Sequence, residues 1–538
     1  MPMTRTLWTW AAALLWAVSG AALAAPLTPV ERRLVLDEFC SGAETQPAAV
    51  ARIVEAGVAD DRAWSAQVIA ALRSGSFVCR DAQAPIIAGQ DPVLDASTLQ
   101  PIRGEVADAP FVPSIVMMRL LTVASAQMDL FSPTLETRRA AAAQVDKSYA
   151  TLSPNVVARA LTVERDADVK LILILALAKR GLSSDSPAER LQAIATVAQA
   201  PSETSRTLLT NFLNDRKDTL DVQTLSTTQA ALRSIDRWLL AGHVCSVLFS
   251  GLSYAGVLLI TALGLSIVFG LLGVINLAHG EFIMIGAYTT YVVERLMRSY
   301  LPGLFDTYIF VAIPVAFAVS ALGGVLLEVC VIRFLYRRPL ETLLATWAVS
   351  IALIKLVQLS FGAQNVEFIT PAFLNGGMQV FAGFFITWNR IFAIVLALLI
   401  FAATYALIRR TRLGLLVRAT TQRRDTARSL GVAAERIDRL AFGLGAGLAG
   451  LAGVVLTQIT SVNPSMGTSF VVDAFMVVVL GGAGSLVGTA VSSLALGEIN
   501  QFIEPLYGAV AAKVAVLVLI VLIIQRRPQG LFALKTRI

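Results

Sequence analysis

Charged residues are scarce in this chain and unevenly distributed. Asp, Glu, Lys and Arg make up 15% of the 538 residues and hydrophobic residues 56%, which is too apolar for a water-soluble protein of this length. Residues 241–538 carry 21 basic and 12 acidic side chains, whereas the residues before them carry 23 basic and 25 acidic ones. The overall charge of +7 therefore indicates membrane topology and not a nucleic-acid-binding surface.

Cysteine and histidine are also rare. With four cysteines and two histidines, the sequence holds no Cys/His set at metal-ligand spacing, so we expect neither a metal nor a cofactor. The sequence likewise lacks the G-x-x-x-x-G-K-[ST] phosphate loop. This chain therefore does not hydrolyse nucleotide by that route, and we expect it not to be an enzyme.

The first 240 residues are predicted to be exported and helical. Residues 1–25 have the basic start, apolar core and Ala-Leu-Ala end of a secretory signal, or of an uncleaved anchor. Residues 26–240 then form a periplasmic helical domain, in which 136–145, 168–179 and 187–198 share helical spacing of alanine and leucine. Such repeats are typical of a HEAT-like solenoid or of a plain helical bundle. On the outer side of the membrane, Cys40 and Cys79 could hold a disulfide.

Residues 241–538 are predicted to be a polytopic membrane helix bundle, so that the whole chain is all-α. The stretch 246–280 contains no Asp, Glu, Lys or Arg and is longer than the roughly 20 residues that one span needs. An external N-terminal domain and a basic, cytoplasmic C-terminus require an odd number of spans. About eight or nine transmembrane elements are expected, at 246–269, 282–293, 309–332, 343–361, 391–408, 440–459, 470–480, 485–503 and 513–524.

Small and ionisable residues single out positions within these spans. Gly443, Gly447 and Gly450 lie in a run of small residues that permits close helix contact in lipid. Ionisable residues at membrane depth are costly and therefore functional by default, although polar groups also satisfy the backbone at helix breaks. The translocation-path candidates are Asn276, His279, Glu281, Glu498 and Asn500. Lys513 is near enough in sequence to pair with an acid of this region, and Glu328 with Lys355 is a second expected ion pair.

The stretch 407–438 lies between two strongly apolar segments. From Arg409 to Arg439 it carries nine arginines against three acids, so the positive-inside rule places it in the cytoplasm. Residues 422–430 are predicted to form a short helix, with Thr421 as its N-terminal cap and Gly431 as a left-handed C-terminal cap. Such a cationic helix is either a contact for a cytoplasmic partner or an ordinary positive loop that fixes topology.

Three strings resemble those of the branched-chain amino acid ABC permeases. They are GLLVRATTQRRDTARSLGV at 414–432, GLSIVFGLLGVINLAHGEF at 264–282 and VLGGAGSLVGTA at 479–490. The resemblance implies an ATP-driven importer with a second permease subunit, two separate ABC ATPase subunits and a periplasmic substrate-binding protein, set in the bacterial inner membrane and its lipid. It also implies an ATPase-coupling loop made of Gly414, Leu416, Arg418, Arg423, Arg424, Ala427, Arg428, Leu430 and Gly431.

The substrate rests on resemblance and not on chemistry. A permease of this type with a long N-terminal extension is most similar to the urea transporter permeases, so urea is the first expectation. A branched-chain amino acid is the alternative within the family. A secondary transporter driven by an ion gradient would need coupling acids and an internal repeat, and no clear repeat is visible. A membrane sensor is the third alternative, and only the importer should co-purify with ATPases.

Overall fold

The protein consists of two compact units. A computed structural model describes residues 27–59, 61–80, 84–88, 92–102, 109–216, 219–336, 338–381, 383–527 and 530–532. Unit 1 is Met1–Leu239 and unit 2 is Leu240–Ile538, and helix α11 (Val222–Leu272) runs through the boundary between them. The predicted signal sequence lies outside the described residues. The described part is mostly helical, but it includes two small β-sheets, so the all-α prediction needs this correction.

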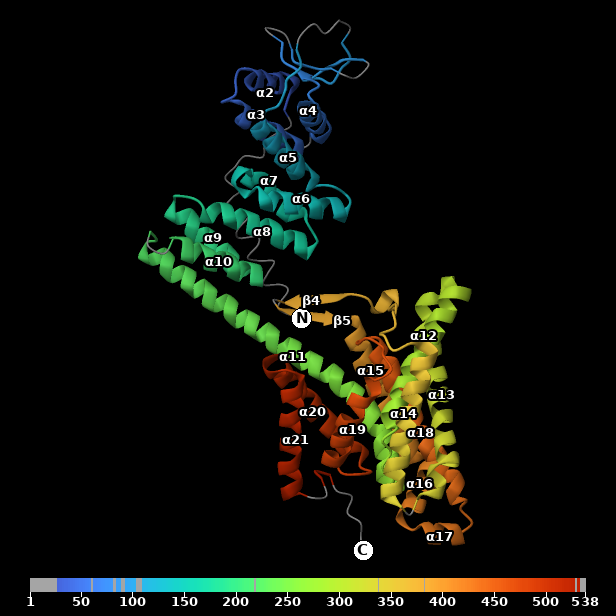
Figure 1. Cartoon of the computed structure of the whole chain (residues 1–538). Helices are drawn as coiled ribbons and strands as arrows, with labels where there is room; N and C mark the ends of the chain where they lie inside the picture. The colour runs from blue at the N-terminus through green and yellow to red at the C-terminus, as the bar shows by residue number, and fades with distance from the viewer. Residues whose placement is uncertain are drawn as a thin grey trace. The chain divides into compact units, whose positions relative to one another are not determined.

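Unit 1 is a succession of short helices that pack on their neighbours (Figure 1). Three apolar cores follow one another along the chain, the first centred on Trp64, the second on Val145 and the third on Ile194. The three similar stretches fall on α6, α8 and α9, and the HEAT-like assignment stays a prediction. The helices are α2 (Pro29–Cys40), α3 (Gln46–Ala59), α4 (Arg62–Ser74), α5 (Ile115–Asp129), α6 (Leu135–Lys147), α7 (Pro154–Val163), α8 (Ala167–Leu182), α9 (Pro187–Gln199) and α10 (Glu203–Arg216), with the 3-10 turn η1 (Tyr149–Thr151).

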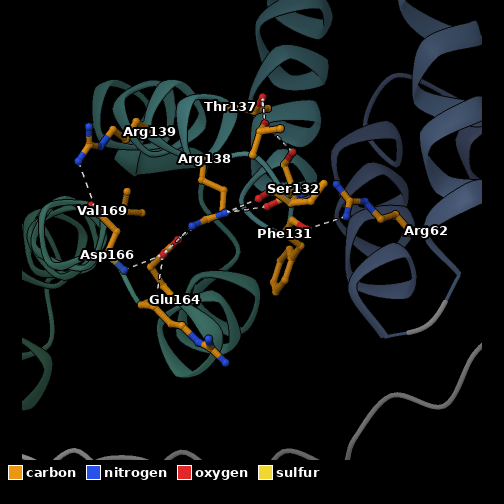
Figure 2. A network of polar contacts seen from close by, with 12 residues as sticks. Arg62, Phe131, Ser132, Thr137, Arg138, Arg139, Glu164, Asp166 and Val169 are labelled. Carbon is orange, nitrogen blue, oxygen red and sulfur yellow. Dashed lines mark hydrogen bonds and ion pairs between the residues drawn. The ribbon is translucent and has the colours of Figure 1, made fainter. Parts of the chain in front are cut away.

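A small β-sheet, a disulfide and two buried or capping carboxylates connect the helices of unit 1. Three short antiparallel strands, β1 (Phe77–Val78), β2 (Ile86–Ile87) and β3 (Leu94–Asp95), interrupt the helices after α4. Cys40 at the end of α2 is disulfide-bonded to Cys79, with Cα atoms 5.7 Å apart. Further along, Arg138 of α6 holds Glu164 at the start of the loop into α8, and Asp166 caps α8 by accepting from the Val169 amide at 3.0 Å (Figure 2).

Unit 2 is a bundle of long apolar helices. Seven helical stretches among the described residues are long and apolar enough to cross a membrane. The two remaining predicted elements are helices that fall short of this criterion, because α19 has 16 residues and α12 carries Glu281, Glu294, Arg295 and Arg298. The helices after α11 are α12 (His279–Tyr300), α13 (Tyr308–Cys330), α14 (Pro339–Phe361), α15 (Trp388–Arg410), α16 (Arg412–Gln422), α17 (Arg424–Ser429), α18 (Ala434–Thr457), α19 (Met466–Gly481), α20 (Leu486–Tyr507) and α21 (Ala509–Arg526).

Short elements connect these helices. Two 3-10 turns, η2 (Pro302–Thr307) and η3 (Ile332–Phe334), stand at helix ends, and a third, η4 (Ala372–Leu374), lies in the connection between α14 and β4. Between α14 and α15, strands β4 (Gly377–Phe381) and β5 (Phe384–Thr387) form an antiparallel hairpin. The sequence does not predict this hairpin, because its apolar residues are interleaved with glycine and not with polar residues in strict alternation.

Helices α12, α13 and α18 pack at close range because their contact faces are made of small residues. A Cβ added to Gly450 would stand 2.3 Å from Ser320 Oγ of α13, and one added to Gly286 of α12 would stand 2.1 Å from Gly450 O. Gly443 and Gly447 face Val325 and Phe317 of α13 in the same way. The small-residue run of α18 therefore contacts α13 along its length.

Candidate functional site

Helix α12 begins inside the bundle and not at its edge. His279, its first residue, places Nε2 3.1 Å from the carbonyl oxygen of Thr261 in α11. Thr261 precedes the last residue of α11, Leu272, by eleven positions, which is about 16 Å along a helix axis. The segment 273–278 therefore turns back into the bundle, where the residues after Gly273 are buried or half-buried, as such breaks require.

The polar side chains at this break are held by neighbouring helices. Asn276 Oδ1 accepts from the Ala278 amide at 3.0 Å, and Ser350 Oγ of α14 donates to Glu281 Oε1 at 2.8 Å. Asn276, His279 and Glu281 are each at most 2% exposed. Among the described residues, Asn276 Nδ2, His279 Nδ1 and Glu281 Oε2 have no hydrogen-bond partner. The structure thus brings three of the five path candidates to one helix break, each with a free polar atom.

The face of α14 that meets this break is a row of hydroxyl groups. Thr342, Thr346 and Ser350 are buried at four-residue spacing, while Trp347 and Ile351 beside them are exposed. Thr346 Oγ1 accepts from the Leu277 amide at 3.2 Å. Sequence reasoning missed this row, although hydroxyl residues at helical spacing in an otherwise apolar span could have revealed it.

The other two path candidates point in different directions. Asn500 of α20 lines a small cavity of about 10 Å³ together with Asp473 of α19 and Lys513 of α21. Tyr254 Oη of α11 donates to Asp473 Oδ2 at 2.9 Å, and Lys513 Nζ lies 3.7 Å from the same oxygen. Glu498 instead faces Gly251 of α11, where an added Cβ would stand 2.3 Å from Glu498 Oε2. Glu498 and Asn500 therefore do not form one site, and the basic partner in this region belongs to Asp473.

The arginine-rich segment forms two helices, α16 and α17, at one end of the bundle (Figure 1). Gly414 permits the tight turn from α15, because a Cβ there would stand 2.1 Å from Ile408 O. The predicted capping by Thr421 is wrong: its hydroxyl donates to Val417 O at 2.7 Å within α16, and α17 begins after Arg423 without a side-chain cap. Gly431 follows the end of α17 with φ +86°, a left-handed conformation that favours glycine.

The exposed side of this segment differs from the expected one. Leu430 is 80% exposed, and Arg423, Arg428 and Gly431 are exposed as well. Ala427 is 4% exposed and Leu416 packs on the core of the bundle, so neither is free to fill a groove on a partner. Arg418 is half-buried in α16. The sequence could not settle these orientations, because the buried face of a helix of six residues depends on how it docks.

Arg424 is also turned inward, into a charge cluster made of Glu328, Tyr336, Arg424, Asp438 and Arg439. Arg424 Nη2 donates to Asp438 Oδ2, and its guanidinium carbon lies 5.2 Å from the centroid of the Tyr336 ring. Tyr336 Oη donates to Glu328 Oε1 at 3.4 Å, and Arg439 Nε lies 3.7 Å from Glu328 Oε2. The predicted pair between Glu328 and Lys355 is wrong, since Lys355 Nζ donates to Gln358 Oε1 at 2.9 Å.

Burial determines the chemistry of this cluster. Asp438 is 1% and Glu328 2% exposed, so both carboxylates depend on protein partners for compensation. Burial of Tyr336, together with the nearby charges of Asp438 and Glu328, raises the pKa of its hydroxyl. The tyrosine therefore stays protonated and can donate its hydrogen bond at every ordinary pH.

Comparison with known proteins identifies the bundle. The family described as "Branched-chain amino acid transport system / permease component" matches residues 247–525, just over half of the chain. The chain belongs to this family. It is therefore the permease component of a transport system, a non-catalytic subunit with several membrane spans.

Individual relatives match up to about half of this permease. The high-affinity branched-chain amino acid transport system permease protein BraD of Pseudomonas aeruginosa is 30% identical over 299 residues, 54% of this chain and 95% of the relative. LivH of Escherichia coli K12 is 30% identical over 293 residues, 53% and 94% of the two chains. The ribose import permease protein RbsC of E. coli K12 is 31% identical over 136 residues, 23% and 42%. No solved structure matches.

The matched region holds every polar group described above for the permease. The helix break at α12, the α16–α17 segment and the charge cluster all lie within residues 247–525. Unit 1 lies almost entirely outside it, and the alignments with BraD and LivH already cover nearly the whole of those proteins. Unit 1 is therefore an addition to the permease and not a part of the shared bundle.

Proposed function

We propose that the permease is the membrane-spanning subunit of an ATP-driven importer and contacts separate ATPase subunits through α17 and the residues after it. The supporting observation is the exposed surface of Arg423, Arg428, Leu430 and Gly431, in which a leucine is 80% exposed beside two arginines. Since the sequence has no phosphate loop, the ATP must be hydrolysed by other subunits. The proposed assembly has two permease subunits, two ATPases and a binding protein.

We infer the orientation from charge. Nine arginines between 409 and 439 favour a cytoplasmic position of α16 and α17 in a bacterial cell, with the C-terminus on the same side. Unit 1 then lies in the periplasm, where the disulfide between Cys40 and Cys79 could persist. A binding protein would approach the permease from that side.

The solute path is proposed to pass the break at α12. A small polar solute crossing the bundle needs donors and acceptors where the surroundings are otherwise apolar, and Asn276, His279 and Glu281 each offer a buried atom with no partner among the described residues. Discontinuous helices with polar groups near the midplane are typical of solute sites in transporters. Asn500 and Glu498 belong to separate surroundings and have a weaker claim to line the same path.

For the substrate, the comparisons support a branched-chain amino acid better than urea, because BraD and LivH are named for that transport. Urea remains a second candidate because of unit 1, which lies outside the residues that the family model matches. Both solutes combine N–H donors with carbonyl or carboxylate acceptors. Uptake of radiolabelled L-leucine and of radiolabelled urea by cells with and without the chain, each with the other as competitor, decides between them.

The coupling proposal is tested at Leu430. We expect Leu430→Asp to abolish co-purification of the ATPases while the protein still inserts, because an acidic side chain replaces the exposed apolar contact. Leu301→Asp is the control, since Leu301 is 53% exposed and directly follows α12, outside the α16–α17 segment. Normal ATPase binding by the Leu430 variant would contradict the proposed contact.

A further inference from the structure

The charge cluster has a place in the fold that the family assignment does not explain. Its five residues come from four segments: Glu328 from α13, Tyr336 from the turn after η3, Arg424 from α17, and Asp438 and Arg439 from the first turns of α18. Arg424 is the member that belongs to the proposed ATPase-contacting helix. The cluster therefore joins that helix to two helices of the bundle.

The contacts run through the cluster without a gap. Arg424 donates to Asp438 and lies over the Tyr336 ring. Tyr336 in turn donates to Glu328. Arg439, the residue after Asp438, lies close to the same Glu328 carboxylate. Arg424 and Arg439 balance the two carboxylates in number. A displacement of α17 that carried Arg424 away would leave Asp438, which is 1% exposed, as an uncompensated buried charge. Moving α17 without moving α18 is thus unfavourable.

Helix α18 also contacts α12, the helix that carries two of the proposed path residues. A Cβ added to Gly286 of α12 would stand 2.1 Å from Gly450 O of α18, and one added to Gly450 would stand 2.3 Å from Ser320 Oγ of α13, so the three helices have little freedom to slide separately. Glu281, at the helix break, lies five residues before Gly286 on the same helix. A shift of α18 is therefore passed to the helix that carries the proposed path residues.

We propose that the charge cluster is the link that transmits movement of α17 to α18 and α13, and that Arg424 and Asp438 are positioning residues for ATP-driven transport. This inference rests on the proposed contact between α17 and the ATPases. It assigns to Arg424 a role distinct from that of the exposed Arg423 and Arg428, which face the partner. The cluster does not bind the ATPase. It transmits the movement that ATPase binding causes in α17 to α18 and α13.

Two variants separate transmission from docking. Asp438→Asn keeps the shape of the side chain but removes the charge that holds Arg424, and Arg424→Lys keeps the charge but removes the planar group that fits both carboxylate and ring. The complex of permease, ATPases and binding protein is reconstituted in lipid vesicles. Three quantities are measured: the amount of ATPase bound, the rate of ATP hydrolysis, and the uptake of L-leucine or urea per ATP hydrolysed.

We expect both variants to bind ATPase and hydrolyse ATP while uptake per ATP falls about ten-fold, the size of a typical coupling free energy between sites. Asp438→Glu, which restores the charge, should recover part of the loss. Arg423→Gln should do the opposite, lowering ATPase binding with uptake per ATP unchanged. Glu341→Gln is the neutral control, because its pair with Arg338 is exposed and lies outside the cluster.

Unchanged uptake per ATP in Asp438→Asn and in Arg424→Lys overturns the inference. A parallel fall of ATPase binding and uptake in both variants also overturns it, because the cluster would then only support the docking surface. If Asp438→Asn does not insert, Arg424→Lys decides by the same ratio. Failure of the proposed function is recognised separately, since the wild-type permease would then bind no ATPase.

Discussion

Glu164 joins three segments of unit 1 through one buried carboxylate (Figure 2). Arg138 of α6 donates to both of its oxygens, at 2.8 and 3.3 Å, and the amides of Arg165 and Asp166 donate to Oε1 at 2.8 and 2.9 Å. Burial alone would raise the pKa of Glu164, but the Arg138 guanidinium and the two amides outweigh it and lower the pKa below the ordinary glutamate value. The ionised form is therefore bound more strongly in the folded unit.

We predict that Glu164→Gln destabilises unit 1 by about 2 kcal/mol, the value of hydrogen bonds to a charged group. Because the folded pKa is lowered, the wild-type contribution is present above the ordinary glutamate pKa of about 4.3 and is lost as pH falls through the lower folded value. Hydrogen exchange at the Arg165 and Asp166 amides measures it. Glu136→Gln, at an exposed position of α6, is the control, and equal exchange in both variants would contradict the prediction.

Gly450 lies where the close packing of α13 and α18 leaves no room for a side chain. A Cβ at this position would stand 2.3 Å from Ser320 Oγ and 3.0 Å from Ala316 O. We predict that Gly450→Ala lowers the thermal stability of the detergent-solubilised permease by an overpacking cost of about 1–3 kcal/mol. Gly303→Ala should leave it unchanged, since no heavy atom lies within 4 Å of its added Cβ. An unaltered melting temperature for both variants would show that α13 and α18 separate freely.

At the scale of elements, the sequence predicts which segments are helices better than it predicts which helices are neighbours. All nine apolar stretches are helices, although α12 and α19 fall short of the length and composition of a membrane span. The partner of Lys513 could not be predicted, because Asp473 lies on another helix and sequence separation says nothing about neighbours in a bundle. The depth at which α12 begins also needed the structure, since the contact between His279 and Thr261 depends on the path of 273–278.

The disulfide ties the end of α2 to the strand region that follows α4. Cys40 and Cys79 are 39 positions apart, for which the chain-entropy model gives about 4 kcal/mol of stabilisation. We predict that Cys40→Ser lowers the unfolding temperature of unit 1 and leaves that of the membrane bundle unchanged. Thiol labelling of the oxidised wild-type protein checks the bond itself: modification of both cysteines in the folded protein would show that it does not form.

At the scale of the whole molecule, charge and motif lead to the correct family, because both belong to the bundle that the family model matches. The bundle and its basic segment follow from composition and from three matching strings. The expectation of urea depends on the presence of a long N-terminal extension, which indicates a substrate less directly than the residues of a binding site do. Unit 1 has three consecutive apolar cores and a repeated helical pattern, which suit a docking surface for the proposed binding protein.

We propose that this permease works in an importer driven by ATP hydrolysis on separate subunits. The most direct measurement is uptake of radiolabelled L-leucine and urea by vesicles that hold the permease, its co-purified ATPases and the binding protein, with ATP supplied on the ATPase side. We predict uptake that requires ATP and is unaffected by collapsing the ion gradients. Uptake that persists without ATP and stops when the gradients are collapsed would contradict the account and identify a secondary transporter.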